Sequence, residues 1–578
     1  MTDTVTPQSD RPDWRNRTLI LALVGAIAAW LVWWIMDMSA PYIDRAFDPS
    51  ILARRAALAT GIAVAAIAFG FGLERIRIRW TVGFALVLGL VAGLILWWNN
   101  DGHGIWNWSG ASLFLAIALA VPLFQVARDE GRLSFPYSQI HGHAWTNVVL
   151  WFACWAFAGI SMLLTVLMAE LFKLIGITFL HDLLEKGWFP ALVIGGAFGA
   201  ALGLFRDRDT VVRLLQRVVT GVLSVLAPIL GAGLLIFLLS LPFTGLHTLW
   251  EATRNTTPIL LTCVIGALIL TNAVLGHGPE DEATNPILRG GAMALGVAML
   301  PLAIVAAIAT GLRIQQYGFT PDRLWALVFV ILTTAYGMVY FVALIRKRQN
   351  WAVQVRPDNI RLAFATLALA LLMATPLVGF NAISTNSQVA RLTSGKVSVD
   401  KFDWAALAFD FGEPGRRALA SLSRSANSAI AAKAKGTQKA DSRWDIAGVD
   451  TMGDGAAALA KRVRILPHAV ALPEGLLLSF QTGATDTGTA VLWYEPGASS
   501  AVLVSSNCDK CAPQVSLARR DAKGEWQQDR NAADLGRSRG VEENKALSDL
   551  LAKQGFQLRP VQRRQVFIGD QPVGDPFE

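Results

Sequence analysis

Two cysteines separated by two residues form the most reactive pattern in this chain. Cys508 and Cys511 lie near the C-terminal end, between two segments of β-prone residues. In an oxidising compartment such a pair closes a turn as a disulfide, and this is the preferred interpretation. A thioredoxin-like redox pair would open a helix after a strand, which the following Ala512-Pro513 does not suit. Half of a zinc site is the third interpretation, and it would need a second ligand pair.

A second group of candidates lies around one long apolar segment. His141 and His143 could hold a metal ion in an extended chain, but no third ligand is nearby in the sequence. The preferred interpretation is that His143 and Trp145 anchor the start of a helix at the membrane surface. Glu170 and Lys173 follow near the far end of the same segment. Their spacing places them on one helix face, where they can form an ion pair.

The segment from Tyr317 to Arg323 combines turn and helix-start signals. Gly318 permits a turn, Thr320 is the predicted N-cap of a helix, and Pro321 suits the first helical position. Arg323 then falls in the first helical turn, where the helix dipole disfavours a cation. An acidic side chain, a carbonyl group or a lipid phosphate would offset that effect. Arg323 is therefore a candidate functional residue.

Motifs for the common chemistries are absent from the sequence. The chain contains no G-x-x-x-x-G-K-[ST] phosphate loop, no H-E-x-x-H pair and no G-x-S-x-G elbow. No basic stripe interleaved with aromatic residues is present, so nucleic-acid binding is not expected. We predict no catalytic, cofactor-binding or metal-ligating residue, and a non-enzymatic protein is favoured over an enzyme.

Long apolar helices are the elements that would position these residues. Of the 578 residues, 53% are hydrophobic and only 16% are charged, against about 25% charged in soluble proteins. Apolar runs of about 20 residues cross a hydrocarbon core of ~30 Å. Eleven spans are predicted: Thr18–Met36, Ala56–Leu73, Thr81–Trp98, Ala111–Val126, Val148–Met168, Trp188–Phe205, Val218–Leu241, Thr257–Leu275, Gly290–Leu312, Leu324–Ile345 and Ile360–Phe380.

Small residues and prolines indicate where these helices pack or bend. Gly195, Gly199 and Gly203 recur every fourth residue on the sixth span, which leaves one helix face flat. Packing within one bundle is favoured over a subunit contact. Four prolines inside spans predict kinks of the kind that line transporter sites, namely Pro122, Pro228, Pro301 and Pro376. The middles of the spans carry almost no ionisable residue, which argues against ion-coupled carriers but not against carriers of lipids.

The distribution of lysine and arginine orients the spans. With the N-terminus inside, the inside segments carry about twice as many of these residues as the outside loops. An odd number of spans then places the C-terminal part outside. We therefore predict a multi-pass protein of a bacterial inner membrane, with a cytoplasmic N-terminus and a periplasmic C-terminal domain. The lipid bilayer is the predicted partner, together with a periplasmic protein or envelope component, and the oligomeric state stays open.

After the last span the composition becomes that of a soluble domain. Residues 415–434 are rich in alanine and serine and predict helix, and Glu542–Gln554 predicts an amphipathic helix. Predicted strands are Val463–Val470, Leu476–Gln481, Ala490–Tyr494, Ala501–Ser505, Gln514–Ala518 and Val566–Ile568. The predicted fold is an all-α polytopic membrane bundle followed by a small soluble α+β domain. Its parts are a cytoplasmic tail (1–17), the bundle (18–382), a linker with amphipathic and alanine-rich helical pieces (383–445) and the soluble domain (446–578).

Three segments of the chain resemble a bacterial inner-membrane family, domain-of-unknown-function family 4153. They are His143-Ala144-Trp145 with residues 171–177 downstream, residues 317–323, and residues 387–392 just past the last span. The resemblance covers most of the chain and implies a multi-span bundle with a C-terminal domain. It implies no activity and no site residue.

Three functions are compatible with these observations. The first is a non-enzymatic envelope protein whose bundle anchors a periplasmic domain that senses or binds a partner. The second is a transporter or lipid-handling protein, which requires a cavity beside the kinks at Pro228 and Pro301. The third is a membrane enzyme acting on a lipid-linked substrate at the outer face, which requires Arg323, Glu170 and Lys173 to converge.

Overall fold

The computed structural model describes residues 14, 16–37, 49–99, 108–252, 256–440, 442–443, 446, 459–480, 489–506, 514–521, 524–528, 541–556, 564–568 and 571–577. The chain divides into two units, residues 1–397 and residues 398–578. Within the described residues, eleven helices are long and apolar enough to cross a membrane. The chain is therefore a multi-pass membrane protein. The predicted helical bundle followed by a small domain with a β-sheet is confirmed.

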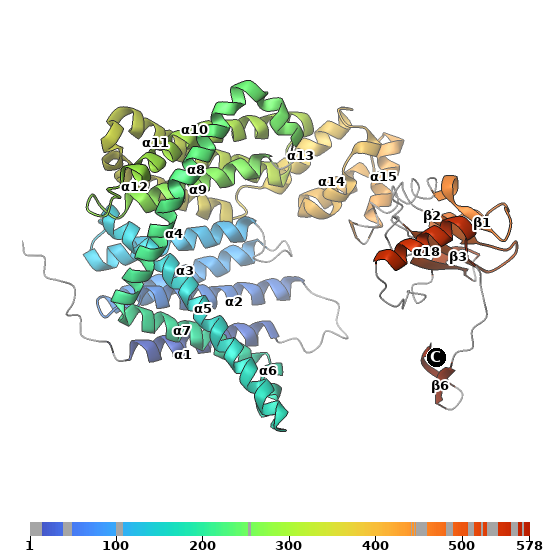
Figure 1. Cartoon of the computed structure of the whole chain (residues 1–578), viewed down its shortest axis with the longest axis horizontal. Coiled ribbons are helices and arrows are strands. Elements are labelled where there is room, and N and C mark those ends of the chain that lie inside the picture. Colours follow the sequence, from blue (N-terminus) through green and yellow to red (C-terminus); the bar gives the residue numbers. More distant parts are fainter. Residues whose placement is uncertain are drawn as a thin grey trace, which may run out of the picture. The chain divides into compact units, whose positions relative to one another are not determined.

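The first helices of the membrane unit form one packed group. They are α1 (Arg17–Asp37), α2 (Pro49–Gly72), α3 (Ile78–Trp98), α4 (Trp108–Glu130), α5 (Tyr137–Leu174), the short α6 (Phe179–Glu185) and α7 (Trp188–Asp207). Helices α1, α2, α3 and α7 run alongside one another, and α5 crosses them obliquely (Figure 1). An oblique course explains why α5, with 38 residues, exceeds the about 20 that a perpendicular span requires.

The remaining helices of this unit pack around a second core. They are α8 (Asp209–Ala252), α9 (Thr256–Leu275), α10 (Pro286–Tyr317), α11 (Pro321–Lys347), α12 (Trp351–Ala374) and α13 (Phe380–Thr393). Leu295, Met299 and Leu302 on α10 are fully buried at the centre of this core. Helix α8 continues through Pro228, and its backbone departs from helical geometry at Gly245, where φ is 73° and ψ is 162°.

The end of the last predicted span differs from the structure. Instead of running from Ile360 to Phe380, α12 begins at Trp351 and ends at Ala374, and Phe380 opens α13. The residue before a proline is biased toward extended backbone. Thr375, which precedes Pro376, has φ −89° and ψ 157°. Pro376 therefore ends the helix rather than kinking it.

The three regularly spaced glycines of α7 face α1. A methyl group added at Gly195, Gly199 or Gly203 would overlap the backbone of Gly25, Leu21 or Thr18, respectively. Backbones this close gain dispersion contacts along the whole helix, which is how helices associate where lipid removes the hydrophobic effect between them. The same spacing on α3 packs Gly89 and Gly93 against α2.

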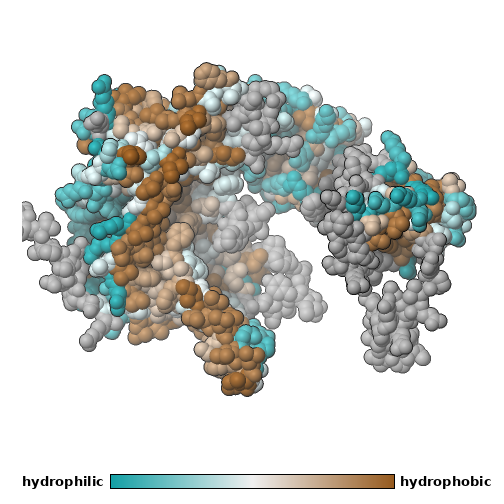
Figure 2. Space-filling model, viewed as in Figure 1, coloured by the Kyte–Doolittle hydropathy of each residue, from teal (hydrophilic) through white to brown (hydrophobic). Residues whose placement is uncertain are grey.

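Apolar side chains cover the exposed surface of the oblique helices. Along α5, Phe152, Ile160, Leu163 and Leu164 are each more than half exposed. Figure 2 shows this apolar surface continuing along the helix toward α6. In water such a surface would be unfavourable, so the lipid bilayer is the environment that it fits.

The second unit combines short helices with two sheets. After α14 (Gly412–Leu422) and α15 (Ser428–Gln438) come β1 (Arg464–Leu466), α17 (Leu476–Ser479), β2 (Thr489–Trp493), β3 (Ser500–Ser506), β4 (Gln514–Arg520), β5 (Trp526–Gln528), α18 (Val541–Gln554), β6 (Arg564–Ile568) and β7 (Gln571–Phe577). Strands β1 to β5 form one sheet in chain order, with β1 parallel to β2 and the other neighbours antiparallel. The unit has its own core, in which Leu476, Leu492 and Leu503 are fully buried.

Two expectations for this unit need correction. Residues 476–479, predicted as strand, form one helical turn after Gly475, whose φ of 83° starts the turn. The predicted helix over 415–434 is two helices, because Asn427 caps a new helix by accepting hydrogen bonds from the backbone N–H groups of Ala429 and Ile430. The predicted disulfide between Cys508 and Cys511 lies outside the described residues.

Candidate functional site

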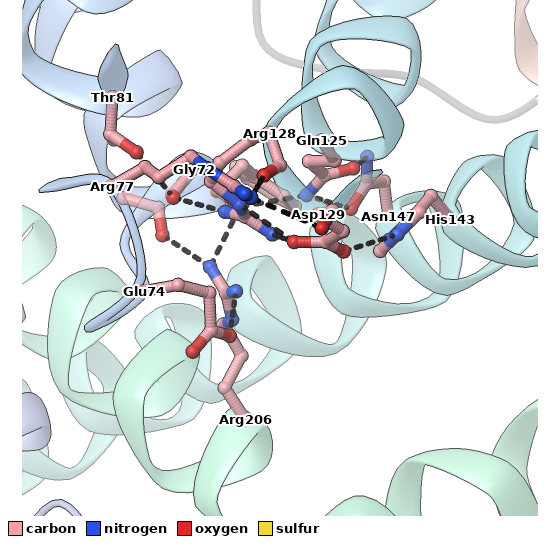
Figure 3. A network of polar contacts seen from close by, with 12 residues as sticks. Gly72, Glu74, Arg77, Thr81, Gln125, Arg128, Asp129, His143, Asn147 and Arg206 are labelled. Carbon is pink, nitrogen blue, oxygen red and sulfur yellow. Dashed lines mark hydrogen bonds and ion pairs between the residues drawn. The ribbon is translucent and has the colours of Figure 1, made fainter. Parts of the chain in front are cut away.

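Three helix C-termini meet at one end of the first helix group, and one of them is that of α2. The last carbonyl groups of a helix have no partner within it. Arg206 of α7 donates to the carbonyl oxygens of Gly70 and Phe71 at 2.9 and 2.7 Å. The carbonyl of Gly72 accepts from Arg128 of α4 and from the Thr81 hydroxyl at 3.0 Å. Side chains from three neighbouring helices therefore cap α2 (Figure 3).

The C-termini of α4 and α7 are capped in the same manner. Arg77 donates to the carbonyl oxygens of Arg128 and Asp129 near the end of α4. Arg17 donates to the carbonyl oxygen of Arg206 near the end of α7, at 3.2 Å. A guanidinium group is favourable there because the helix dipole leaves partial negative charge at a C-terminus.

Carboxylates complete what we call the arginine cluster: Arg17, Glu74, Arg77, Arg128, Asp129, Arg206 and Asp207. Glu74 accepts from Arg17 at 2.8 Å and from Arg206 at 2.7 Å. Asp129 accepts from Nη2 of Arg128 at 2.6 Å and lies 3.1 Å from Nε2 of His143. The Arg128 side chain is only 2% exposed, whereas Arg77 is exposed, so the cluster extends from the interior to the surface.

A polar cleft of about 550 Å³ opens beside the arginine cluster. Its polar lining comes from the loop after α2 and from α4, α5, α7 and α8. These residues are Glu74, Gln125, Arg128, Asp129, Glu130, Gln139, His143, Thr146, Asn147, Arg206 and Arg213. Figure 3 shows His143 pointing at Asp129, and Gln125 pairing with Asn147.

An apolar groove of about 380 Å³ adjoins the same helices. It lies among α1, α2, α5 and α7 and is lined by aliphatic and aromatic side chains and glycines, including Trp151, Trp155 and Phe198. The rings of Trp151 and Trp155 each meet that of Phe198 edge-on, with centroids 5.7 and 5.5 Å apart. The lining of the groove is therefore almost entirely apolar and suits an alkyl chain.

A second polar network joins α5, α8 and the loop after α9. Trp145 donates to Nε2 of His141 at 3.0 Å, so a neutral His141 carries its proton on Nδ1. That Nδ1 lies 2.9 Å from Nδ1 of His277. Nε2 of His277 lies 3.1 Å from Nε2 of the Gln216 carboxamide. His141 therefore binds His277 and not a partner shared with His143.

A third network lies inside the second helix group. The hydroxyl of Tyr340 donates to Asn359 at 3.0 Å and accepts from Asn272 at 2.8 Å. Arg356 of α12 donates to the carbonyl of Leu275, the last residue of α9, and pairs with Glu282 at 3.0 Å. Pro228 of α8 packs directly on Gly291, where an added methyl group would lie 2.5 Å from the proline nitrogen. Helix α8 therefore packs closely on α10 at Pro228.

The segment 317–323 contacts α13. Thr320 accepts from the backbone N–H of Arg323 at 3.4 Å, and the Arg323 guanidinium donates to the Gly318 carbonyl at 2.8 Å. From α13, Gln388 donates to the carbonyls of Tyr317 and Phe319 at 2.9 and 2.8 Å. In the described residues, the Arg323 guanidinium therefore contacts the carbonyls of Tyr317 and Gly318 and lies over the Tyr317 ring.

Glu170 and Lys173 both approach a residue that sequence reasoning missed. His181 of α6 lies 3.5 Å from the Glu170 carboxylate and 3.3 Å from the Lys173 amine. Figure 1 shows α6 well separated from α13, against which the Arg323 segment packs. The geometry therefore does not bring Arg323, Glu170 and Lys173 together.

The arginines of the cleft are conspicuous in the sequence, but sequence reasoning did not identify them as site residues. Arg128, Arg206 and Arg213 entered the sequence argument only as charges that orient the spans. Arg128 and Arg206 lie within a turn of helix C-termini, where carbonyl groups need donors, and Arg213 lies near the start of α8. In the part of the chain that the structure describes, no group of three or more His, Cys, Asp or Glu side chains could hold a metal ion.

Comparison with known proteins gives one match. A family model described as "Domain of unknown function (DUF4153)" matches residues 56–429. The matched range contains the segments 143–145, 317–323 and 387–392. It also contains α4, α5, α7 and α8, which supply most of the cleft lining. No curated protein and no solved structure matches the chain.

Proposed function

The chain belongs to the family defined by the domain of unknown function DUF4153, and we propose that it binds an amphiphilic membrane lipid. The lipid headgroup would occupy the polar cleft, and one of its alkyl chains would follow the apolar groove. Binding of this kind serves a protein that transports, presents or senses lipid.

One observation carries this proposal: the cleft and the groove border the same helices within about one helical turn. On α5, Leu150 lines the cleft and Trp151 lines the groove. On α7, Arg206 lines the cleft and Leu202 lines the groove. A ligand that fills both spaces must have a polar part joined directly to an apolar part, and a membrane lipid has that form.

The cleft would decide which lipid is bound. Inside a bilayer an alkyl chain leaves one apolar environment for another, so the groove adds little free energy of its own. Polar contacts in a site of low dielectric are stronger and depend on the geometry of the ligand. Selectivity is therefore expected to follow the headgroup.

Saturable labelling by a lipid with a photoreactive group in its alkyl chain tests the proposal. We expect labelling of the groove residues in the purified protein to saturate and to be displaced by unlabelled lipid. Ala66→Trp would fill the groove from α2 and should abolish the saturable part. Leu163→Trp, at a residue that is 57% exposed on α5 and outside the groove, is the matched control. Labelling of the unmodified protein that never saturates would mean that only bulk lipid contacts the groove.

A second candidate function rests on the core of the second unit. Its five-stranded sheet and buried leucines support a domain that the membrane bundle anchors and presents to a partner. Residues 398–578 produced alone should then unfold cooperatively and, when supplied in trans, bind the partner that the full chain binds. An isolated unit without a thermal transition would contradict this function and leave the lipid proposal untouched.

A further inference from the structure

We propose that the polar cleft binds a phosphate group and that Arg213 is the cation that contacts it. This inference rests on the proposed lipid function and specifies the headgroup. The argument depends on which charged side chains around the cleft are already occupied by protein partners.

Two of the three arginines that line the cleft are committed to the protein itself. Arg206 donates to two carbonyl oxygens of α2 and to Glu74. Arg128 donates to the Gly72 carbonyl and, through two nitrogens, to Asp129. A guanidinium has five N–H donors in a fixed plane, and these contacts fix the orientation of both groups. Their role is to hold the helix ends.

Arg213 differs from the other two. It lies on α8, is exposed, and lines the cleft. In the described part of the chain, its side chain has no hydrogen-bond or ion-pair partner. Its planar donors are therefore free for an acceptor with two or more oxygens, and phosphate matches that geometry.

The carboxylates of the cleft do not oppose an anion. Glu74 is paired with two arginines, and Asp129 is paired with Arg128 and contacts His143. Glu130 accepts from Gln139 at 2.8 Å and lies 3.6 Å from Arg132. Each of these acids therefore has a cationic partner, whereas Arg213 has none among the described residues, so Arg213 is the cation of the cleft that remains available to an anion.

The experiment compares Arg213→Gln with Arg217→Gln in the full-length protein. Arg217 is exposed one turn further along α8 and does not line the cleft, so it controls for the loss of a positive charge. The probes are phosphatidylglycerol and diacylglycerol in detergent micelles, together with inorganic phosphate and glycerol 3-phosphate as soluble competitors. Binding is measured by native mass spectrometry and by displacement of the photoreactive lipid.

We expect Arg213→Gln to weaken phosphatidylglycerol binding by about tenfold or more, as loss of a charge-assisted hydrogen bond does. Arg217→Gln should bind as the unmodified protein does, and Arg213→Lys should recover part of the affinity. Diacylglycerol, which lacks the phosphate, should bind weakly to every variant. Equal phosphatidylglycerol binding by Arg213→Gln and the unmodified protein would overturn the phosphate assignment while leaving the lipid proposal intact.

The soluble competitors separate the two sources of phosphate. Saturable glycerol 3-phosphate binding that depends on Arg213, without saturable lipid binding, would support the phosphate site and contradict the lipid function. Saturable lipid binding with no dependence on the headgroup phosphate would support the lipid function and contradict the phosphate site. No saturable binding of any probe would overturn both.

Discussion

Arg128 takes a positive charge into a site that is almost closed to solvent, and its surroundings explain why this is tolerated. It satisfies the carbonyl oxygen of Gly72 and pairs with Asp129, whose other oxygen faces His143. Burying a charge is costly unless it is paired and hydrogen-bonded, and here both conditions are met. Removing the Arg128 guanidinium would take a charged donor away from both the Gly72 carbonyl and Asp129, which would keep Thr81 and His143 as their partners.

We therefore predict that Arg128→Ala destabilises the membrane unit strongly. The free energy of unfolding in mixed micelles should fall by about 2 kcal/mol, because a hydrogen bond to a charged group contributes about 1.5–3 kcal/mol. Arg132→Ala is the control, because the Arg132 side chain is 75% exposed and lies 3.6 Å from Glu130, and exposed pairs contribute about 0–1 kcal/mol. Equal effects of the two substitutions would contradict the structural role given to Arg128.

At the scale of elements, arginines at helix ends are a repeated device. Besides α2, α4 and α7, the last carbonyl of α9 accepts from Arg356, and carbonyls at the end of α10 accept from Arg323 and Arg391. Near a bilayer an unpaired carbonyl group costs several kcal/mol because no water replaces the lost hydrogen bond. Some of the arginines that orient the spans thus also donate hydrogen bonds to the unpaired carbonyl groups at helix ends.

Close approach of α1 and α7 leads to a prediction at this scale. Gly199→Ala should lower the free energy of unfolding by about 2 kcal/mol, since overpacking forces helix backbones apart. The added methyl group would overlap the carbonyl of Leu21. The matched control is Gly221→Ala on α8, where a methyl group meets nothing within 4 Å. If Gly199→Ala were as stable as the control, α1 and α7 could not pack as described.

A further prediction at this scale concerns the contact of α13 with the turn between α10 and α11. Gly318 has φ +75°, and a methyl group there would lie 2.6 Å from Cδ of Arg391. Gly395 has nearly the same φ, +73°, but open space around it. Gly318, with φ 75° and ψ −177°, lies in a region essentially limited to glycine, so Gly318→Ala adds backbone strain and the collision, whereas Gly395→Ala adds backbone strain without a collision. We expect proteolysis at α13 to become faster in Gly318→Ala than in Gly395→Ala, whereas equal rates would contradict this attachment.

At the scale of the whole molecule, the membrane bundle and the second unit each have their own core. Within the described residues, the number of helices that can cross a membrane is eleven, which is odd. If all of them cross, the residues before α1 and the second unit lie on opposite sides of the membrane. The excess of lysine and arginine predicts that the N-terminal side is cytoplasmic.

A compartment-sensitive reporter fused after Glu578 tests this arrangement. We expect a signal from outside the cytoplasm and, in the same cells, thiols at Cys508 and Cys511 that react with a labelling reagent only after reduction. A cytoplasmic signal would require an even number of crossing helices. Freely reactive thiols would instead contradict the disulfide and favour the redox or metal interpretation of the pair.

The sequence by itself determined the class of protein and the position of nearly every span. Hydrophobicity over about 20 consecutive residues is a local property, so it can be counted along the chain. The exception at Pro376 is also local, because a proline ended a helix within an apolar run that continued past it.

Only the tertiary structure decided the candidate site. Arg128 and Gly72 are 56 residues apart, His141 and His277 are 136 apart, and Arg206 and Glu74 are 132 apart. A sequence places each of these near the end of a helix but does not say which helix ends meet, since that depends on how all the helix faces pack at once. The cleft, the groove and the absence of a partner for Arg213 among the described residues follow from that packing.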